Sequence, residues 1–318
     1  MDILRWFETV RGRTVPKFIT GLRGTGKTAI LLMLRKRMLD EGIPEKRLPF
    51  IDAEDPSLRQ LATHVQFIDH ILSTLPRDGN SCIFIREAAQ MPNPEIVMGT
   101  LAASGRREIF ATSSSRRLLD RGLAGYFSSR LAHFEVLPEE SRRQYGQKEA
   151  KARWNEIFLR DVLAPSRILE VALAGRVAGW LSDNLGEPVS LRAISAAISP
   201  AHRMLSPHTV ESYLASLEDA HLVEKTIRWD TAEAAPQKTA YRYFFTDPQL
   251  RLAHFGAAPS QEERRTALNR AWLHLRLRTD RVFSASGAEG VDFVSRTTGV
   301  YSHWHVRDNG SVELVAGG

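Results

Sequence analysis

The feature that most constrains the fold of this chain is a glycine-rich stretch near its amino terminus. Residues 21–28, GLRGTGKT, match the spacing G-x-x-x-x-G-K-[ST]. A short strand-like run, Phe18 to Thr20, precedes the stretch, and a pattern of helical spacing follows it from Ala29 to Gly42. In this order of strand, loop and helix, main-chain amides and the helix amino terminus can wrap phosphate groups. The sequence therefore predicts a phosphate-binding loop.

The residues of this loop have distinct expected roles. Lys27 is expected to neutralise phosphate charge and to take part in catalysis, and the Thr28 hydroxyl is expected to ligate Mg²⁺. The expected nucleotide contacts lie in the loop and the first turn of the helix: Gly21, Gly24, Gly26, Lys27, Thr28 and Ala29. The predicted cofactors are therefore ATP and Mg²⁺.

The segments after the loop alternate between apolar runs and helical patterns. Strands are predicted within residues 47–55, 81–87 and 108–115, and a helix over residues 62–75. Alternation of this kind is typical of an α/β domain with a parallel sheet and helices on both faces. Ligands of such sheets bind at the carboxyl ends of the strands.

Polar residues stand at these predicted strand ends. Glu87 follows the strand SCIFIR and is expected to orient the attacking water as a catalytic residue. Arg86 occupies the place where such a strand usually carries the Asp that holds Mg²⁺. The acids Asp52, Glu54 and Asp55 follow the second strand and could lie near the metal.

Residues 112–115 form a polar stretch at the end of the fourth predicted strand. Ser113 and Ser114 are expected to contact the nucleotide, as a sensor of its γ-phosphate. The stretch could equally be a serine-rich loop that caps a helix starting near Arg116.

Several motifs together resemble a known family. The segments GLRGTGKT, IFIREAAQ, IFATSSSRRLL and RGLAGYFSSRLAHFEVLPEE are similar to successive motifs of the AAA_14/DUF4143 family of AAA+-like ATPases. The resemblance implies a P-loop AAA+-like domain that binds ATP and acts as an oligomer.

The chain departs from the family pattern at two places. The Asp that the resemblance implies is Arg86, and its L-x-G-R motif reads LAGYFSSR, with Tyr126 in the arginine position. Glu87 remains, so we expect ATP hydrolysis that is slower than in a standard site. An inert nucleotide switch is the alternative.

An arginine from a neighbouring subunit usually completes such a site. Arg130 is the expected catalytic arginine, with Arg116, Arg117 and Arg121 as further candidates. Each could instead be a solvated surface residue. A finger that acts across subunits implies a homo-oligomer, and we expect a hexameric ring.

The middle of the chain has the pattern of a winged helix-turn-helix. Ser190 and Ser206 are predicted helix caps, and Pro207 the first residue of its helix. Paired strands are predicted at 223–229 and 239–247, joined by a wing loop. The exposed face of the second helix is expected to supply a weak base-reading surface of His208, Thr209, Ser212 and Ser216, and the wing loop phosphate contacts from Lys225, Arg228 and Lys238. Winged helices also bind proteins.

The carboxyl third resembles a restriction-endonuclease-like fold that lacks most of its acids. A helix followed by the strands RVFSAS, VDFVSR and YSHWHV fits its core. The resemblance implies a helix Glu where this chain has Leu268 and a strand Lys where it has Arg307, while Asp292 remains and Glu289 is out of register. We expect a degenerate, non-catalytic domain whose arginines bind DNA: Arg264, Arg265, Arg270, Arg276, Arg278 and Arg281. An active nuclease and a merely solvated helix are the alternatives.

The charge balance permits a nucleic-acid partner without requiring one. The chain has 43 Lys and Arg against 37 Asp and Glu, a net charge of +6. The single Cys82 lies in an apolar run and is predicted to be a small buried residue in a reducing compartment. No run of 18 or more apolar residues occurs, so we expect no membrane association and a cytoplasmic protein.

Together these patterns predict three domains. They are a P-loop AAA+-like ATPase domain at 1–140, a lid or linker with the winged helix at 141–250, and the degenerate nuclease-like α/β domain at 251–318. The expected function is ATP-dependent binding and remodelling of branched or duplex DNA, with branch migration as one outcome. The alternative is a nucleotide-dependent regulatory switch whose winged helix and carboxyl domain bind a protein.

Overall fold

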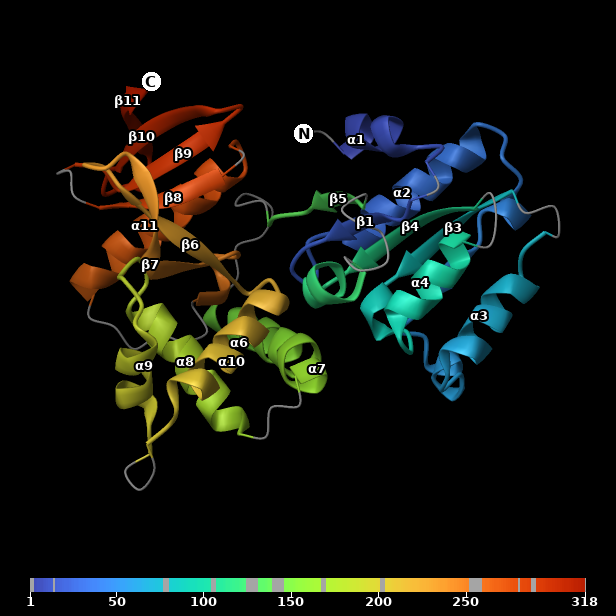
Figure 1. The fold of residues 1–318 in the computed structure, drawn as a ribbon, viewed down its shortest axis with the longest axis horizontal. Helices are drawn as coiled ribbons and strands as arrows, with labels where there is room; N and C mark the ends of the chain where they lie inside the picture. The colour runs from blue at the N-terminus through green and yellow to red at the C-terminus, as the bar shows by residue number, and fades with distance from the viewer. Residues whose placement is uncertain are drawn as a thin grey trace. The chain divides into compact units, whose positions relative to one another are not determined.

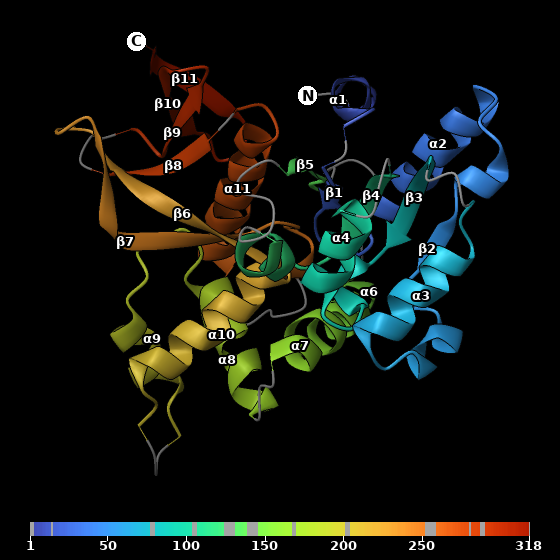
Figure 2. The ribbon, with the colours of Figure 1, turned by 45° about the vertical axis from the view of Figure 1, so that its right-hand side comes forward.

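The computed structural model divides the chain into two compact units, Met1–Leu137 and Pro138–Gly318. The residues that it describes are 3–13, 15–76, 80–103, 107–123, 131–138, 146–166, 170–200, 204–251, 259–279, 281–286 and 290–317. Figures 1 and 2 show the elements of both units.

The first unit is built on a five-stranded parallel sheet of order β2-β3-β4-β1-β5. Its strands are β1 (Lys17–Thr20), β2 (Phe50–Asp52), β3 (Ser81–Arg86), β4 (Arg107–Ser113) and β5 (Ala132–Glu135). Its helices are α1 (Ile3–Val10), α2 (Lys27–Asp40), α3 (His64–Ser73) and α4 (Pro94–Ala103). Short helical turns are η1 (Glu45–Arg47), η2 (Pro56–Gln60), η3 (Ala88–Gln90) and the π-helix η4 (Leu118–Leu123). The predicted α/β fold with a parallel sheet is confirmed.

Helices cover both faces of this sheet because its strands are apolar on both sides. Ile83 and Ile85 of β3 pack in one core with α3 and α4, while Cys82 and Phe84 pack in another with α1 and α2 (Figure 1). Side chains alternate between faces along a strand, so a continuous apolar run feeds both cores. Cys82 is buried as predicted, and this burial raises the pKa of its thiol well above the usual value.

The helices of the second unit begin with α6 (Gln147–Ile157), which continues into the π-helix η5 (Phe158–Leu163) and the short α7 (Ala164–Ser166). Then follow α8 (Val171–Asp183), α9 (Leu191–Ile198) and α10 (Pro207–Asp219), which pack against one another. Ser190 caps α9 by accepting from the Ala193 amide, and Ser206 caps α10 by accepting from the Thr209 amide. Both predicted caps are confirmed.

A six-stranded sheet of order β11-β10-β9-β8-β6-β7 completes the second unit. Its strands are β6 (Val223–Asp230), β7 (Ala235–Phe245), β8 (Arg281–Ser286), β9 (Phe293–Thr297), β10 (Val300–Val306) and β11 (Val312–Gly317), and the helix α11 (Pro259–Arg276) precedes β8. Parallel pairing of β6 with β8 joins the β6–β7 hairpin to the carboxyl-terminal strands, as Figure 2 shows. The predicted winged-helix and nuclease-like parts, divided at residue 250, thus share one sheet and one compact unit.

The hairpin differs from its prediction in where the turn lies. The turn comprises residues 231–234, so Lys225, Arg228 and Lys238 all belong to strands and not to a wing loop. The amine of Lys225 lies 3.6 Å from the centroid of the Tyr241 ring. The turn lies within the loop predicted between residues 229 and 239, and that loop is predicted too long because residues 231–234 contain neither Gly nor Pro to mark the turn.

Candidate nucleotide site

The predicted loop lies between β1 and α2, and its first glycine is required by a close backbone contact. The amide of Val136, just after β5, donates to the carbonyl of Thr20 at 2.7 Å. This contact brings the Val136 carbonyl so close that a Cβ on Gly21 would lie 2.2 Å from its oxygen. Gly21 also has a φ of 142°, which side chains rarely allow. A glycine is therefore the residue that lets β1 continue into the loop beside β5.

The remaining glycines shape the loop around the amino terminus of α2. Gly24 and Gly26 have φ values of 79° and 95°, and Gly26 is the residue that precedes the first helical turn. Gly26 provides no side-chain cap, so the amides of Lys27, Thr28 and Ala29 begin the helix at its positive dipole end. Thr28 is half-buried and Ala29 is exposed. This arrangement suits an anion such as a polyphosphate.

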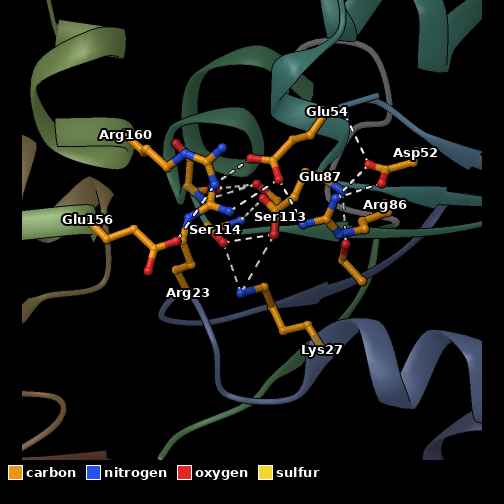
Figure 3. A network of polar contacts seen from close by, with 12 residues as sticks. Arg23, Lys27, Asp52, Glu54, Arg86, Glu87, Ser113, Ser114, Glu156 and Arg160 are labelled. Carbon is orange, nitrogen blue, oxygen red and sulfur yellow. Dashed lines mark hydrogen bonds and ion pairs between the residues drawn. The ribbon is translucent and has the colours of Figure 1, made fainter. Parts of the chain in front are cut away.

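Lys27 is buried and holds the loop together through its amine. Its Nζ donates to the carbonyl oxygens of Gly21 at 2.8 Å and Leu22 at 2.9 Å. It also donates to Ser114 Oγ at 2.9 Å (Figure 3). The carboxylate of Glu87 lies 3.9 Å away. The carbonyl and hydroxyl oxygens that accept from this ammonium carry no formal charge. Charged phosphate oxygens would therefore bind the ammonium more strongly than these oxygens do.

Glu87 is held at the end of β3 by the end of β4. Its carboxylate accepts from the Ser114 amide at 2.9 Å and from the Ser114 hydroxyl at 2.8 Å. Its own amide donates to Thr112 Oγ1 at 2.9 Å, and the residue has a left-handed backbone with φ 52°. A buried non-glycine residue in this conformation is strained and is held by such contacts. Ser114 thus joins Lys27 to Glu87.

Ser113 lies differently from Ser114. Its hydroxyl donates to the Ser115 carbonyl at 2.9 Å and accepts from the Ser115 amide at 3.0 Å. Of the two serines predicted to contact nucleotide, Ser114 therefore contacts the other predicted site residues, while Ser113 stabilises the loop after β4.

Arg86 forms an ion-pair network at the ends of β2 and β3. The parallel register places Arg86 beside Asp52, and Arg86 Nη1 lies 2.7 Å from both Asp52 oxygens. Its Nη2 lies 2.7 Å from Glu54, which also accepts from Arg23 Nη2 at 2.8 Å (Figure 3). Burial acts to lower the pKa of Arg86, but the hydrogen bond to Asp52 and the nearby carboxylates outweigh it and raise the pKa. The guanidinium is therefore a fixed positive charge.

The third acid, Asp55, has a different task. Its side chain accepts from the Ser57 amide at 2.8 Å and caps the short turn η2. This hydrogen bond lowers the pKa of the Asp55 carboxyl. Asp55 is thus a local cap, and Asp52 and Glu54 are bound by arginines.

These contacts decide how well Mg²⁺ fits the site. Magnesium in nucleotide sites is held by one or two carboxylates together with phosphate oxygens and water. Here Arg86 stands at the carboxylate position, and both acids beside it are bound by guanidinium groups. Among the described residues, no group of three or more His, Cys, Asp and Glu side chains could hold a metal ion. The donors at the ends of β2 and β3 therefore do not fit Mg²⁺, although the Thr28 hydroxyl could contribute one ligand.

The candidate arginine fingers are only partly described. Arg116 Nη2 lies 3.0 Å from Glu135, so it forms an ion pair within its own unit. Arg117 is exposed. Arg130 and Tyr126, together with the side chain of Arg121, lie outside the described residues. The identity of a finger stays a prediction.

Sequence reasoning missed three partners in this region. Arg23 was not among the predicted site residues, although it lies within the loop and binds Glu54. Thr20, the last residue of β1, lies 2.6 Å from His133 Nε2 of β5. The ion pair of Arg86 with Asp52 was missed as well. The available signal was the acidic stretch that ends the neighbouring strand.

The second unit presents a poor surface for reading bases. On α10, His208 and Ser212 are exposed, but Ser216 is buried and donates to the Ser212 carbonyl at 2.9 Å. The prediction of Ser216 as an exposed contact is therefore wrong. Ser212 donates to the His208 carbonyl at 3.0 Å. Both hydroxyls therefore donate to carbonyl groups of their own helix.

Asp292, the acid that the sequence retains from a nuclease-like site, is bound inside the second unit. Arg264 Nη2 lies 2.6 Å from one of its oxygens, and the Val306 amide donates to the other at 2.8 Å. Leu268 is half-buried on α11, and Glu289 lies outside the described residues. Trp272 and Phe293 are core residues. These contacts give Asp292 a structural task.

Comparison with known protein families covers most of the chain in two segments. Residues 13–142 match the family model described as "AAA domain" (AAA_14). The first unit has the α/β parallel-sheet fold of a P-loop AAA-like domain. Residues 136–261 match "Domain of unknown function (DUF8612)" rather than the DUF4143 family that the motifs suggested.

The matching proteins of known sequence or structure have low sequence identity to this chain. An "Uncharacterized protein" of Haemophilus influenzae is 23% identical over an alignment 276 residues long, which covers 76% of this chain and 69% of that protein. Yeast Hsp104 in a complex with casein is 15% identical with a TM-score of 0.32; the match covers 69% of this chain but spans only 37% of the Hsp104 chain. Aquifex aeolicus DnaA bound to AMPPCP is 15% identical with a TM-score of 0.30, over 68% of this chain and 86% of that one.

No helix of the described residues has both the length and the apolar character needed to cross a bilayer.

Proposed function

We propose that this protein binds ATP at residues 21–28 and hydrolyses it slowly. The observation that carries the proposal is Lys27, a buried ammonium at the amino terminus of α2 that donates to the Gly21 and Leu22 carbonyls and to the Ser114 hydroxyl and lies 3.9 Å from the Glu87 carboxylate. The predicted contacts of the triphosphate are the amides of residues 21–29 together with Lys27 and Ser114. Glu87 is the proposed base that orients water, and its attachment to Ser114 supports slow turnover because the same carboxylate must leave or share that contact.

Nucleotide binding is tested with two lysines of the same helix. Lys27→Ala should weaken ATP binding by roughly 10- to 100-fold, because it removes charge-assisted hydrogen bonds. Lys36→Ala is the matched control, since the amine of Lys36 is exposed and bonds Asp40 at 2.9 Å. Titration with a fluorescent ATP analogue measures both. Equal affinities for the two variants would contradict the proposal.

Hydrolysis is tested at Glu87. Glu87→Gln should lower steady-state turnover by roughly a hundredfold or more while ATP still binds, because the general base is lost and the loop at residues 21–28 is unchanged. Phosphate release assays measure turnover. Unchanged turnover would assign Glu87 a structural role and leave the protein a nucleotide switch.

We further propose that the second unit binds branched or duplex DNA, and that the working form is an oligomeric ring in which an arginine such as Arg130 completes the site. The net charge of +6 and the packed helices α8 to α10 followed by a hairpin support DNA as the partner. Exposed basic residues such as Arg270 would contact phosphates without reading bases.

One observation favours the second candidate, a switch that binds a protein. Arginines of the second unit form ion pairs within the unit: Arg264 with Asp292, Arg276 with Glu224 and Arg307 with Glu313. Paired arginines attract phosphate less than free ones. Salt separates the candidates, because DNA binding by phosphate contact weakens steeply between low and physiological salt and an apolar protein interface does not. Anisotropy with labelled duplex and four-way DNA, with and without ATP, measures this dependence.

A further inference from the structure

We infer that ATP binds to this loop without a divalent metal ion, because the guanidinium of Arg86 occupies the place of the metal-binding carboxylate. The inference rests on the proposed ATP binding and adds the cation requirement of the site. It follows from the way charges are arranged at the ends of β2 and β3.

The first step is the balance of charge beside the loop. Asp52 and Glu54 bring two negative charges, and Arg86 and Arg23 bring two positive charges to the same network. The distances are 2.7–2.8 Å, and the side chains are mostly shielded from solvent, with exposed fractions of 9–35%. The charges of these four side chains therefore balance without any bound ion. Partial burial keeps its ion pairs from being screened as surface pairs are.

The second step concerns the oxygens that a metal would need. Mg²⁺ prefers charged oxygen ligands in near-octahedral geometry. Arg86 Nη1 binds both oxygens of Asp52, and each oxygen of Glu54 is bound by an arginine. The Glu87 carboxylate is bound by the amide and hydroxyl of Ser114. A metal that took one of these oxygens would compete with a guanidinium ion pair or with the contact of Glu87 with Ser114.

The third step is repulsion. A divalent cation bound near the end of β3 would lie beside the fixed positive charge of Arg86 and close to the ammonium of Lys27. Like charges a few ångströms apart disfavour one another most strongly where water is excluded. The positive charge that neutralises a triphosphate must then come from Lys27 and the amides at the start of α2. These groups are present whether or not a metal is bound.

The test compares the affinity of the full-length protein for ATP in millimolar Mg²⁺ and in excess EDTA, measured by calorimetry. For the wild type we expect the two dissociation constants to agree within about threefold. Weakening by about tenfold or more in EDTA would overturn the inference while leaving ATP binding established. No binding in either buffer would overturn both the inference and the proposed function.

Substitution of Arg86 provides the converse test. Arg86→Asp places a third carboxylate beside Asp52 and Glu54 and removes the guanidinium, so ATP binding should become metal-dependent, with about tenfold weakening in EDTA. Arg35→Gln is the matched control, because Arg35 pairs with Glu45 at 2.9 Å and lies in a separate ion pair. It should keep the wild-type ratio.

A third variant keeps the test valid if Arg86→Asp does not fold. Arg86→Gln removes the charge and adds none, and it frees Asp52 from its ion pair. We expect its EDTA-to-Mg²⁺ ratio to exceed that of the wild type and of Arg35→Gln. A ratio equal to the wild type would show that Arg86 does not set the cation requirement and would overturn the inference.

Discussion

Arginine side chains bind acidic residues at two places where the sequence suggested metal chemistry, and the surroundings of the two pairs differ. At the end of β3, Arg86 lies 2.7 Å from Asp52, and Lys27, Glu87 and Ser114 lie close by at the nucleotide loop. Before β9, Arg264 lies 2.6 Å from Asp292, and the other partners of Asp292 are the Val306 amide and the His305 ring.

The difference shows that an arginine bound to a carboxylate can have different consequences at two sites. Around Arg86 lie Lys27, Glu87 and Ser114, the other residues predicted for a nucleotide site, and we infer that this arginine removes the need for a divalent ion. Around Asp292 the bonds lead into the fold of the second unit. There the arginine joins α11 to the end of β10 and stabilises the sheet.

The largest expected effect tests whether the loop at residues 21–28 requires a glycine where it passes β5. Gly21→Ala should lower the free energy of unfolding by about 3 kcal/mol or more and abolish ATP binding, because its Cβ would meet the Val136 carbonyl at 2.2 Å. Gly42→Ala is the control, with φ 89° but nothing within 4 Å of the added Cβ, and should cost about 1 kcal/mol. Urea unfolding measures both. Similar losses for the two variants would mean that β5 does not constrain the loop.

An intermediate effect tests the structural role of the second pair. Arg264→Ala should lower the free energy of unfolding by about 1–2 kcal/mol, because it leaves Asp292 with one partner fewer and removes a bond to the Val306 carbonyl. Arg307→Ala breaks the exposed pair with Glu313 and should cost about 0.5 kcal/mol or less. We expect no Mg²⁺-dependent DNA cleavage by the wild type. Cleavage that disappears in Asp292→Ala would break the comparison.

The smallest expected effect tests the link that Ser114 forms between Lys27 and Glu87. Ser114→Ala removes the hydroxyl that bonds both Lys27 and Glu87, so it should cost about 1 kcal/mol of stability and change ATP turnover. Ser73→Ala is the control, since its hydroxyl bonds only locally to the His70 carbonyl at 2.7 Å. Unchanged ATP turnover in Ser114→Ala would show that the Ser114 hydroxyl, which links Lys27 to Glu87, does not contribute to catalysis.

Local signals predicted much of the fold. The strand at 18–20 and the helix after Gly26 follow from apolar spacing and glycine chemistry, and they appear as β1 and α2. Ser190 and Ser206 cap their helices because a serine hydroxyl can accept from an amide two or three residues on. The predicted β3 and β4 also formed, since continuous apolar runs favour strands that are buried on both faces.

Other features depend on residues far apart in the chain. The ion pair of Arg86 with Asp52 requires β2 to lie beside β3 in one particular register, and the pairing of β6 with β8 requires strands separated by α11 to meet. Neither leaves a pattern within one segment.

The sequence by itself determined the glycine-rich loop between β1 and α2, since the positive φ values of Gly24 and Gly26 and the start of α2 arise within a few consecutive residues. It also determined that Arg86 stands where a carboxylate is usual. Only the tertiary structure decided what that arginine binds, because its partners come from β2 and the residues after it, and side-chain charges interact through space over a few ångströms whatever their separation along the chain.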